Sequence, residues 1–97
     1  MAAGEVTVRL PGVLTELAGG ERTLAVAVPP AATVADVLDA LAQRHPALVR
    51  RIRDERGDVR QHVHVYLGDE DVRTSGGTAT GVAPGAELLV VPAVSGG

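Results

Sequence analysis

Three short segments of this 97-residue chain alternate apolar and polar residues. Between the second and third of these segments lies a stretch in which apolar residues recur at helical spacing. Alternation with a period of two is typical of a strand with one buried face. It occurs over residues 6–10, 24–28 and 63–67. A continuous apolar run at Leu88–Val91 predicts a last strand that is central and buried on both faces. The pattern therefore predicts an α+β domain with few helices.

The helical stretch carries its own start and stop signals. Thr33 is a good N-cap residue, and Asp36 stands three residues later, as in a capping box. Pro46 restricts the residue before it, so the helix is predicted to end near His45. Residues 48–52 indicate a second, short helical turn. The apolar stripe of the main helix has the spacing i, i+3, i+4, i+7 and consists of Val34, Val37, Leu38 and Leu41.

The connecting segments are predicted to be turns and loops. Residues 11–21 contain Pro and Gly residues typical of turns. They are expected to be a loop that connects the first two strands into an antiparallel hairpin. Residues 68–71 predict a turn, 72–73 a brief strand and 74–80 a polar loop. Pro92 is expected to end regular pairing.

The order strand, strand, helix, strand, short strand, strand fits a two-layer domain with a helix across one sheet face. If the first and last strands are central neighbours, they run parallel. That arrangement is the β-grasp, or ubiquitin-like, fold, with a mixed sheet of about four to five strands and one main helix. We expect residues 1–92 to form this domain and residues 93–97 to be a flexible Gly-Gly tail.

The composition excludes several classes of function. Tyr66 is the only aromatic residue, so the core is built from Val, Leu and Ala, and base-stacking nucleic-acid platforms are disfavoured. The net charge is −3, which does not indicate a phosphate-backbone partner. All nine basic residues are Arg, which excludes Schiff-base and P-loop lysine chemistry. The absence of Cys excludes disulfides and thiolate chemistry. No apolar run is long enough to span a bilayer, so a cytoplasmic location without membrane contact is expected.

No motif between the two ends of the chain predicts an active site. His62 and His64 form an H-x-H pair, but no third ligand accompanies them, so no metal site is expected. The acidic residues at 69–71 are expected to be solvated in their turn, and the basic residues at 50–56 on a solvated surface. The segment 75–78 has neither the spacing nor the lysine of a P-loop.

The C-terminal Gly96-Gly97 has a different character. Two residues without side chains can thread a narrow cleft, and the five residues from Ala93 span about 17 Å when extended. The terminal carboxylate is ionised at neutral pH and is a poor electrophile. Attack on the α-phosphate of ATP would give an acyl-adenylate, from which a sulfur donor could displace AMP and leave a thiocarboxylate. The lack of Cys permits this scheme, because the sulfur would be bound covalently at the C-terminus itself.

These features resemble the ubiquitin-like sulfur carriers of the MoaD/ThiS family over nearly the whole chain, and within it the CysO branch that serves a bacterial route to cysteine. Ser95 stands where that branch has another small residue. The most specific matches are Val63–Leu67, Asp69–Arg73, Ser75–Gly77, Ala79–Thr80 and Pro92–Gly97.

The resemblance implies that Gly97 is the reactive residue and Gly96 its threading neighbour. It implies an E1-like adenylating enzyme of the MoeB/ThiF type that binds ATP and magnesium. It also implies a downstream acceptor, either a PLP-dependent cysteine synthase with a zinc metalloprotease after it or another thiolating enzyme. The carrier itself would bind no cofactor and would be a cosubstrate rather than an enzyme.

Alternatives remain open at this level. The chain could be the small subunit of molybdopterin synthase, a ubiquitin-like protein modifier, or an interaction module whose glycines are accidental. Docking is expected through Val94 and Ser95 of the tail and through side chains of the third strand. His62, His64 and Tyr66 are the candidates there because they alternate with core-facing residues. Tyr66 is the better anchor, since aromatic residues dominate interface hot spots.

Overall fold

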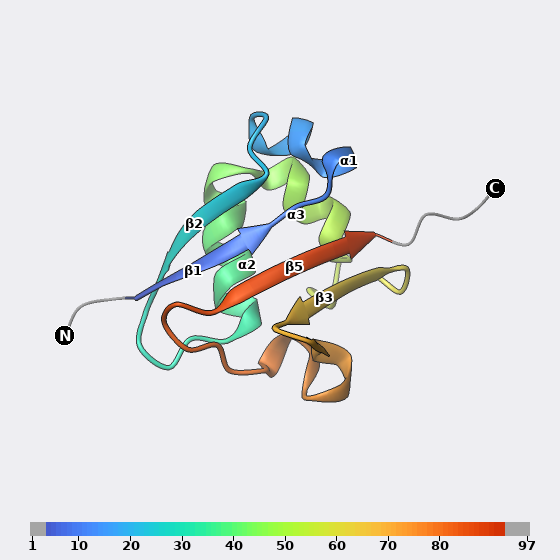
Figure 1. Cartoon of the computed structure of the whole chain (residues 1–97). Helices are drawn as coiled ribbons and strands as arrows, with labels where there is room; N and C mark the ends of the chain where they lie inside the picture. The colour runs from blue at the N-terminus through green and yellow to red at the C-terminus, as the bar shows by residue number, and fades with distance from the viewer. Residues whose placement is uncertain (1–3, 93–97) are drawn as a thin grey trace.

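The computed structural model describes residues 4–92, which form one mixed sheet with helices packed against one of its faces (Figure 1). The strands lie in the order β2-β1-β5-β3-β4. Their bounds are β1 Gly4–Arg9, β2 Thr23–Val28, β3 Val63–Leu67, β4 Glu70–Asp71 and β5 Glu87–Pro92. β1 and β5 are adjacent and parallel, whereas the other pairs are antiparallel. The first and last strands are thus the central pair, and the predicted β-grasp architecture is confirmed.

The β1–β2 hairpin follows directly from the alternation in the sequence. Val6 lies opposite Val26, and Val8 lies opposite Leu24. All four of these side chains are buried, and the residues between them face the other side of the sheet. A shift of one residue would expose all four side chains, so the register is strongly specified.

The helices cover the buried face of the sheet. α2 (Val34–Arg44) begins with a complete capping box: Asp36 N donates to Thr33 Oγ1 over 3.3 Å, and Thr33 N donates to Asp36 Oδ2 over 2.8 Å. α3 (Pro46–Ile52) follows at once and begins with Pro46. Proline is tolerated there because the N–H group that it lacks would have no partner within the helix in the first turn. Both helices match the predictions. Within residues 4–92 no helix is long and apolar enough to cross a membrane.

The core contains no aromatic side chain among the described residues, as the composition predicts. No polar or charged residue of the described part is buried with it. Its largest fully buried members are Leu38, Leu41, Leu48, Ile52, Leu88, Val6, Val8, Val34, Val37, Val65, Val72 and Val90.

The prediction that the last strand is buried on both faces is wrong. In β5, Leu88 and Val90 are buried, but Leu89 is 40% exposed. The reason is that the helices lie on one side of the sheet only, so even a central strand keeps one open face. Pro92 also differs from expectation, because it pairs with Val63 as the last residue of the strand instead of following it.

Two predicted loops contain short helical segments. Residues 12–18 form α1 (Gly12–Thr15) and the 3₁₀ segment η1 (Glu16–Ala18), which together bury Leu14 and Ala18 one turn apart. The spacing of these two apolar residues indicates a helical segment, but the Pro and Gly residues around them favoured the prediction of a loop.

The brief strand predicted at 72–73 lies two residues earlier, at β4. Val72 instead begins the 3₁₀ segment η2 (Val72–Thr74), which turns its side chain into the core. A second 3₁₀ segment, η3 (Gly77–Ala79), occupies part of the polar loop predicted at 74–80. Burial of a single valine therefore decides where the edge strand ends.

Candidate docking face and the start of the C-terminal segment

The helices leave one face of the sheet uncovered, and we call it the outer face. It faces the viewer in Figure 1, with α2 behind the strands. Strand pairing places Arg9, Leu89, Tyr66 and Asp71 in one row across it. Further side chains on the same face are Thr7, Ala25, His64, Glu87 and Val91.

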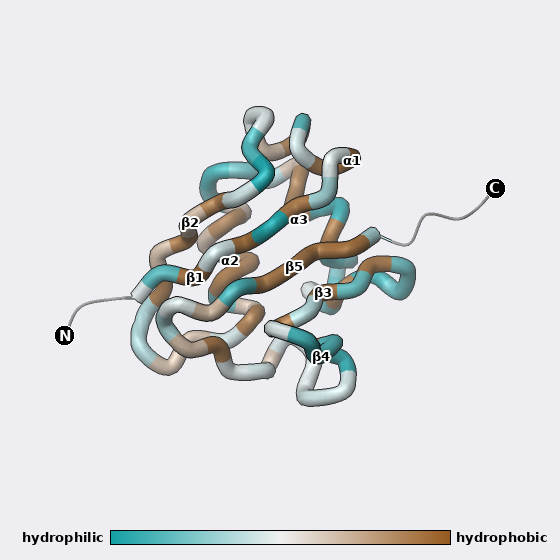
Figure 2. The backbone as a smooth tube through the Cα atoms, in the orientation of Figure 1, coloured by the Kyte–Doolittle hydropathy of each residue, from teal (hydrophilic) through white to brown (hydrophobic). Residues whose placement is uncertain are grey.

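The centre of the outer face is apolar. Leu89 and Val13 are the exposed large hydrophobic residues of the part that the structure describes, and only Leu89 belongs to the sheet. Figure 2 shows β5 as a largely hydrophobic band. Tyr66 is half-buried beside Leu89, and its ring stacks with that of His64 at a centroid distance of 6.2 Å. An apolar centre with amphipathic aromatic neighbours has the composition of a protein interface.

A polar cluster holds His64 in place at the β3–β4 edge. His64 Nδ1 donates to Asp71 Oδ2 over 2.8 Å, and Arg73 Nη1 lies 3.3 Å from the same ring nitrogen. The backbone N–H of Arg73 donates to Asp71 Oδ1 over 2.9 Å. That hydrogen bond, followed by the one from His64, lowers the pKa of Asp71 below its ordinary value. Asp71 is therefore a carboxylate that positions an imidazole, whereas the sequence suggested a solvated turn residue.

A second charged pair borders the apolar centre. Arg9 Nη1 lies 3.6 Å from Glu87 Oε2, and their side chains are 58% and 51% exposed. An ion pair this exposed contributes at most about 1 kcal/mol to stability. Arg9 and Glu87 thus place exposed charges beside Leu89.

His62 does not share the position of the other two predicted docking residues. It lies in the turn before β3 and is exposed, whereas His64 and Tyr66 lie on the strand itself. The expectation that all three alternate along one strand face is correct for His64 and Tyr66 only. Within residues 4–92 no group of three His, Asp or Glu side chains is arranged to hold a metal ion.

The residues predicted to carry chemistry, Val94, Ser95, Gly96 and Gly97, lie outside the described residues. The structure shows where they are attached. Pro92 is the last residue of β5, a central strand of the sheet, so the segment 93–97 follows directly on that strand in the chain. The strand that carries the apolar centre is thus the one from which the C-terminal segment begins.

Sequence reasoning missed Leu89 and the Asp71–Arg73 contacts. Leu89 was hidden inside an unbroken apolar run, where alternation cannot be recognised. The contacts of Asp71 and Arg73 depend on β4 pairing with β3, and no local pattern shows that pairing.

Comparisons with known proteins agree with this geometry. The ThiS family matches residues 8–97. The sulfur carrier protein CysO of Mycobacterium tuberculosis is 34% identical over 94 residues, which cover 95% of this chain and 98% of that protein. Small archaeal modifier protein 1 of Haloferax volcanii is 42% identical over 84 residues, covering 87% of this chain and 91% of that one. A chain from the crystal structure of the Amycolatopsis orientalis BexX/CysO complex superposes with a TM-score of 0.85 at 37% identity, covering 95% of this chain and 99% of its own.

Proposed function

Since this chain belongs to the ThiS family of ubiquitin-like sulfur carriers, we propose that its terminal glycine, Gly97, is adenylated by an E1-like enzyme and converted to a thiocarboxylate that donates sulfur in biosynthesis. The observation that carries the proposal is that the family match extends through Gly97, which follows the last residue of a central strand by five positions. The chain is a cosubstrate of its partners in this scheme, not a catalyst.

The chemistry consists of two substitutions. A carboxylate oxygen of Gly97 attacks the α-phosphorus of ATP, which forms the acyl-adenylate and releases pyrophosphate. A sulfide-level nucleophile then attacks the carbonyl carbon, the bond to AMP breaks, and the nucleophile's proton is released to solvent. The net change on the carrier is the replacement of one oxygen by sulfur. Adenylation is required because a carboxylate is otherwise too poor an electrophile.

The folded body supplies recognition in this proposal. The apolar centre of the outer face, Leu89 and Tyr66, docks on the activating enzyme of the MoeB/ThiF type, and the charged pairs around it set the orientation. ATP and magnesium belong to that enzyme. PLP or zinc, where used, belongs to the downstream acceptor, and this chain binds none of these groups.

Cysteine or a thiolated metabolite is the product that we propose. The likeness to CysO and to a chain of a BexX/CysO complex supports this assignment. The acceptor is then a cysteine synthase or another thiolating enzyme. The molybdopterin-synthase alternative stays a prediction, and stable co-purification with the large subunit of that enzyme would replace the cysteine assignment.

The test is intact-protein mass spectrometry after incubation with the activating enzyme, ATP and sulfide. The full chain is expected to gain about 16 Da, the difference between sulfur and oxygen in a captured acyl group. A variant that lacks Gly97 should keep the melting temperature of the full chain and gain no mass, and omission of ATP should also abolish the gain. A full chain that stays unchanged beside an enzyme shown to form ATP-dependent adenylate on another carrier would refute the proposal.

A second candidate function is protein modification, and the 42% identity to small archaeal modifier protein 1 favours it. The activated Gly97 would then acylate lysine amines of other proteins instead of receiving sulfur. Tryptic peptides that carry a branched remnant of the C-terminal segment, linked by an isopeptide bond, would identify this function in cells. The chain has no lysine, so it cannot form chains of itself through lysine side chains.

A further inference from the structure

A cationic hollow lies at the end of β5, away from the apolar centre of the outer face. It has a volume of about 350 Å³, and Pro92 forms part of its wall. The side chains of Arg50 and Arg51 from α3, and of Arg60 and His62 from the segment before β3, line it together with Leu14. No carboxylate lines it. Three arginines thus line one hollow of a chain whose net charge is −3.

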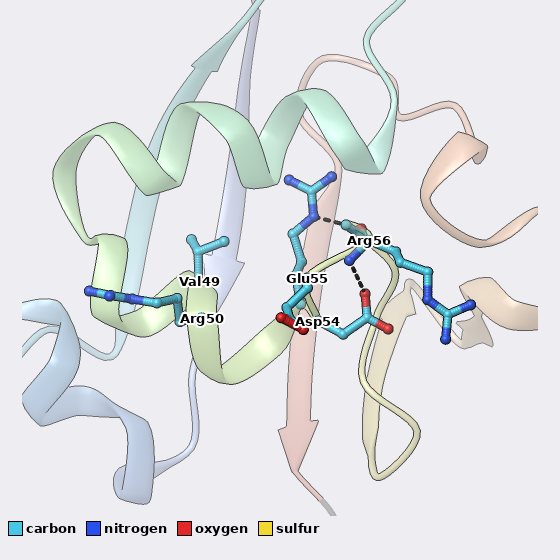
Figure 3. Close-up of a pocket in the computed structure, with 7 residues that line it drawn as sticks. Val49, Arg50, Asp54, Glu55 and Arg56 are labelled. Carbon is cyan, nitrogen blue, oxygen red and sulfur yellow. Dashed lines mark hydrogen bonds between the residues drawn. The ribbon is translucent and has the colours of Figure 1, made fainter.

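Within residues 4–92 these arginines form no ion pair, and the neighbouring hollow provides a contrast. That second hollow, of about 320 Å³, is lined by Asp54 and Glu55 as well as by arginines, so its charges compensate one another. Figure 3 shows it, with the Asp54 carboxylate bonded to the backbone of Arg56 and the Arg50 side chain directed away from both. Arg50 lines both hollows, and only in the cationic hollow does no carboxylate accompany it.

The cationic hollow is held by contacts of its own. Arg60 Nε donates to the Arg50 carbonyl over 2.9 Å, and Arg60 N donates to the Ile52 carbonyl over 2.9 Å, which ties the segment before β3 to the end of α3. The Arg60 carbonyl in turn accepts a hydrogen bond from Arg73 Nη2. Arg50 and Arg51 lie in the last turn of α3, where the helix dipole favours cations.

We propose that this hollow docks an acidic surface of the protein that receives the C-terminal segment. The inference rests on the proposed function, because it needs a partner that takes up Gly97. Five residues separate Pro92 from the end of the chain, so that partner must approach within about 17 Å of Pro92. A partner that holds the terminus therefore comes within reach of the hollow, whose wall includes Pro92.

The chemistry of the hollow favours carboxylates on a protein over a small phosphate. Helix ends that bind phosphate present backbone N–H groups, whereas the end of α3 beside the hollow presents carbonyl groups. Arg50 and Arg51 are exposed and Arg60 is half-buried, so the guanidinium groups are accessible to side chains of an opposing surface. Guanidinium groups bind carboxylates and phosphates alike in bidentate geometry, so it is the end of α3 that favours carboxylates here.

Titration of the isotope-labelled full chain with a hexaglutamate peptide, followed by NMR, tests the site without any enzyme. Chemical-shift changes are expected to centre on Arg50, Arg51, Arg60 and His62 and to weaken as salt is added. A parallel titration with inorganic phosphate distinguishes the source of the anion. Saturation by phosphate without a response to the peptide would overturn the proposal, and so would peptide shifts scattered over the whole surface.

The variant R50Q/R51Q tests the same surface in the activation reaction, and R22Q/R56Q is the matched control because it removes two charges outside the hollow. The first variant is expected to raise the KM for the carrier by about three- to tenfold with kcat unchanged, and to flatten its dependence on salt. The control should do neither. Melting temperatures of both variants verify folding. Equal effects of the two variants would show that net charge, not the hollow, matters.

The two proposals fail in different ways. If the wild-type chain is not activated but hexaglutamate still binds at the hollow, the proposed function is wrong and the acidic-ligand site stands. If activation proceeds with the same KM and salt dependence in R50Q/R51Q as in the wild type, the docking proposal is wrong and the proposed function stands.

Discussion

At the residue scale, Gly4 and Asp71 each have a contact that a single substitution would remove or disrupt. Gly4 lies where the start of β1 meets the segment before β5, and a side chain there has no room because Pro84 occupies the space. Asp71 lies at the edge of the outer face and holds His64 through its carboxylate. The first contact concerns stability alone, and the second connects stability to the docking face.

Gly4→Ala is expected to destabilise the fold by about 1–3 kcal/mol, because backbone must shift to relieve the overlap. A Cβ at this position would lie 2.4 Å from the Pro84 Cβ. Gly12→Ala is the matched control, since nothing lies within 4 Å of a Cβ built there. Urea denaturation of both variants measures the difference. Equal stability of the two would contradict the close approach of β1 to Pro84.

Asp71→Asn should change how stability depends on pH. The pKa of Asp71 is lowered from 3.8 in the folded state, first by the Arg73 backbone N–H and then by His64. Its ionised form therefore stabilises the fold above pH 3.8, and this contribution is lost as the pH falls through the lower, folded-state pKa. The difference between wild type and variant should shrink between about pH 5 and about pH 2.

Denaturation curves over this pH range measure that difference in stability. Asp69→Asn is the control, because it removes the same charge from an exposed position close by and should not show this pH dependence. A gap between wild type and Asp71→Asn that stays constant down to the lowest pH would show that the Asp71 carboxylate does not act through its charge.

At the element scale, α2 shows how few residues set a helix boundary. Thr33 and Asp36 exchange hydrogen bonds across the first turn of α2. Pro46 stands two residues after Arg44, the last residue of the helix. The apolar stripe between these signals then faces the sheet. This helix forms from local rules that its burial on the sheet reinforces.

Thr33→Ala is expected to cost about 1 kcal/mol, since it leaves an N–H group of the first turn without its acceptor. Thr33→Ser retains the hydroxyl and should recover most of that loss. Thermal denaturation followed by circular dichroism measures both variants. If serine performs no better than alanine, packing of the threonine methyl group, not the cap, accounts for the effect.

At the scale of the whole molecule, the sheet separates stability from recognition. Its inner face packs on the helices, whereas its outer face presents Leu89 and Tyr66 and ends at Pro92. The cationic hollow lies beside that same end. Docking surfaces and the start of the C-terminal segment therefore meet on one side of the fold.

Adjacent residues of β5 should separate the two roles. Leu88→Ala is expected to cost about 2–5 kcal/mol, because Leu88 is 1% exposed and its removal leaves a cavity. Leu89→Ala should cost less than about 1 kcal/mol of stability and should raise the KM for the carrier about fivefold in the activation reaction. Denaturation and activation kinetics on the same samples measure both effects. An unchanged KM for Leu89→Ala would remove the outer face from the docking site.

The sequence by itself determined the three main strands, the capped helix and the valine- and leucine-rich core, because alternation, helical spacing and capping are local signals. That β1 and β5 are parallel central neighbours followed only from the structure, because the two strands lie far apart in the chain. The sequence also predicted that Gly96-Gly97 are the reactive end, and this stays a prediction because both residues lie outside the described part of the chain. Only the tertiary structure decided that the outer face stays open at Leu89, that β4 brings Asp71 to His64, and that Arg60 meets Arg50 and Arg51 beside Pro92. Each of these depends on contacts between segments far apart in the chain or on which face the helices leave uncovered, and no local pattern encodes either.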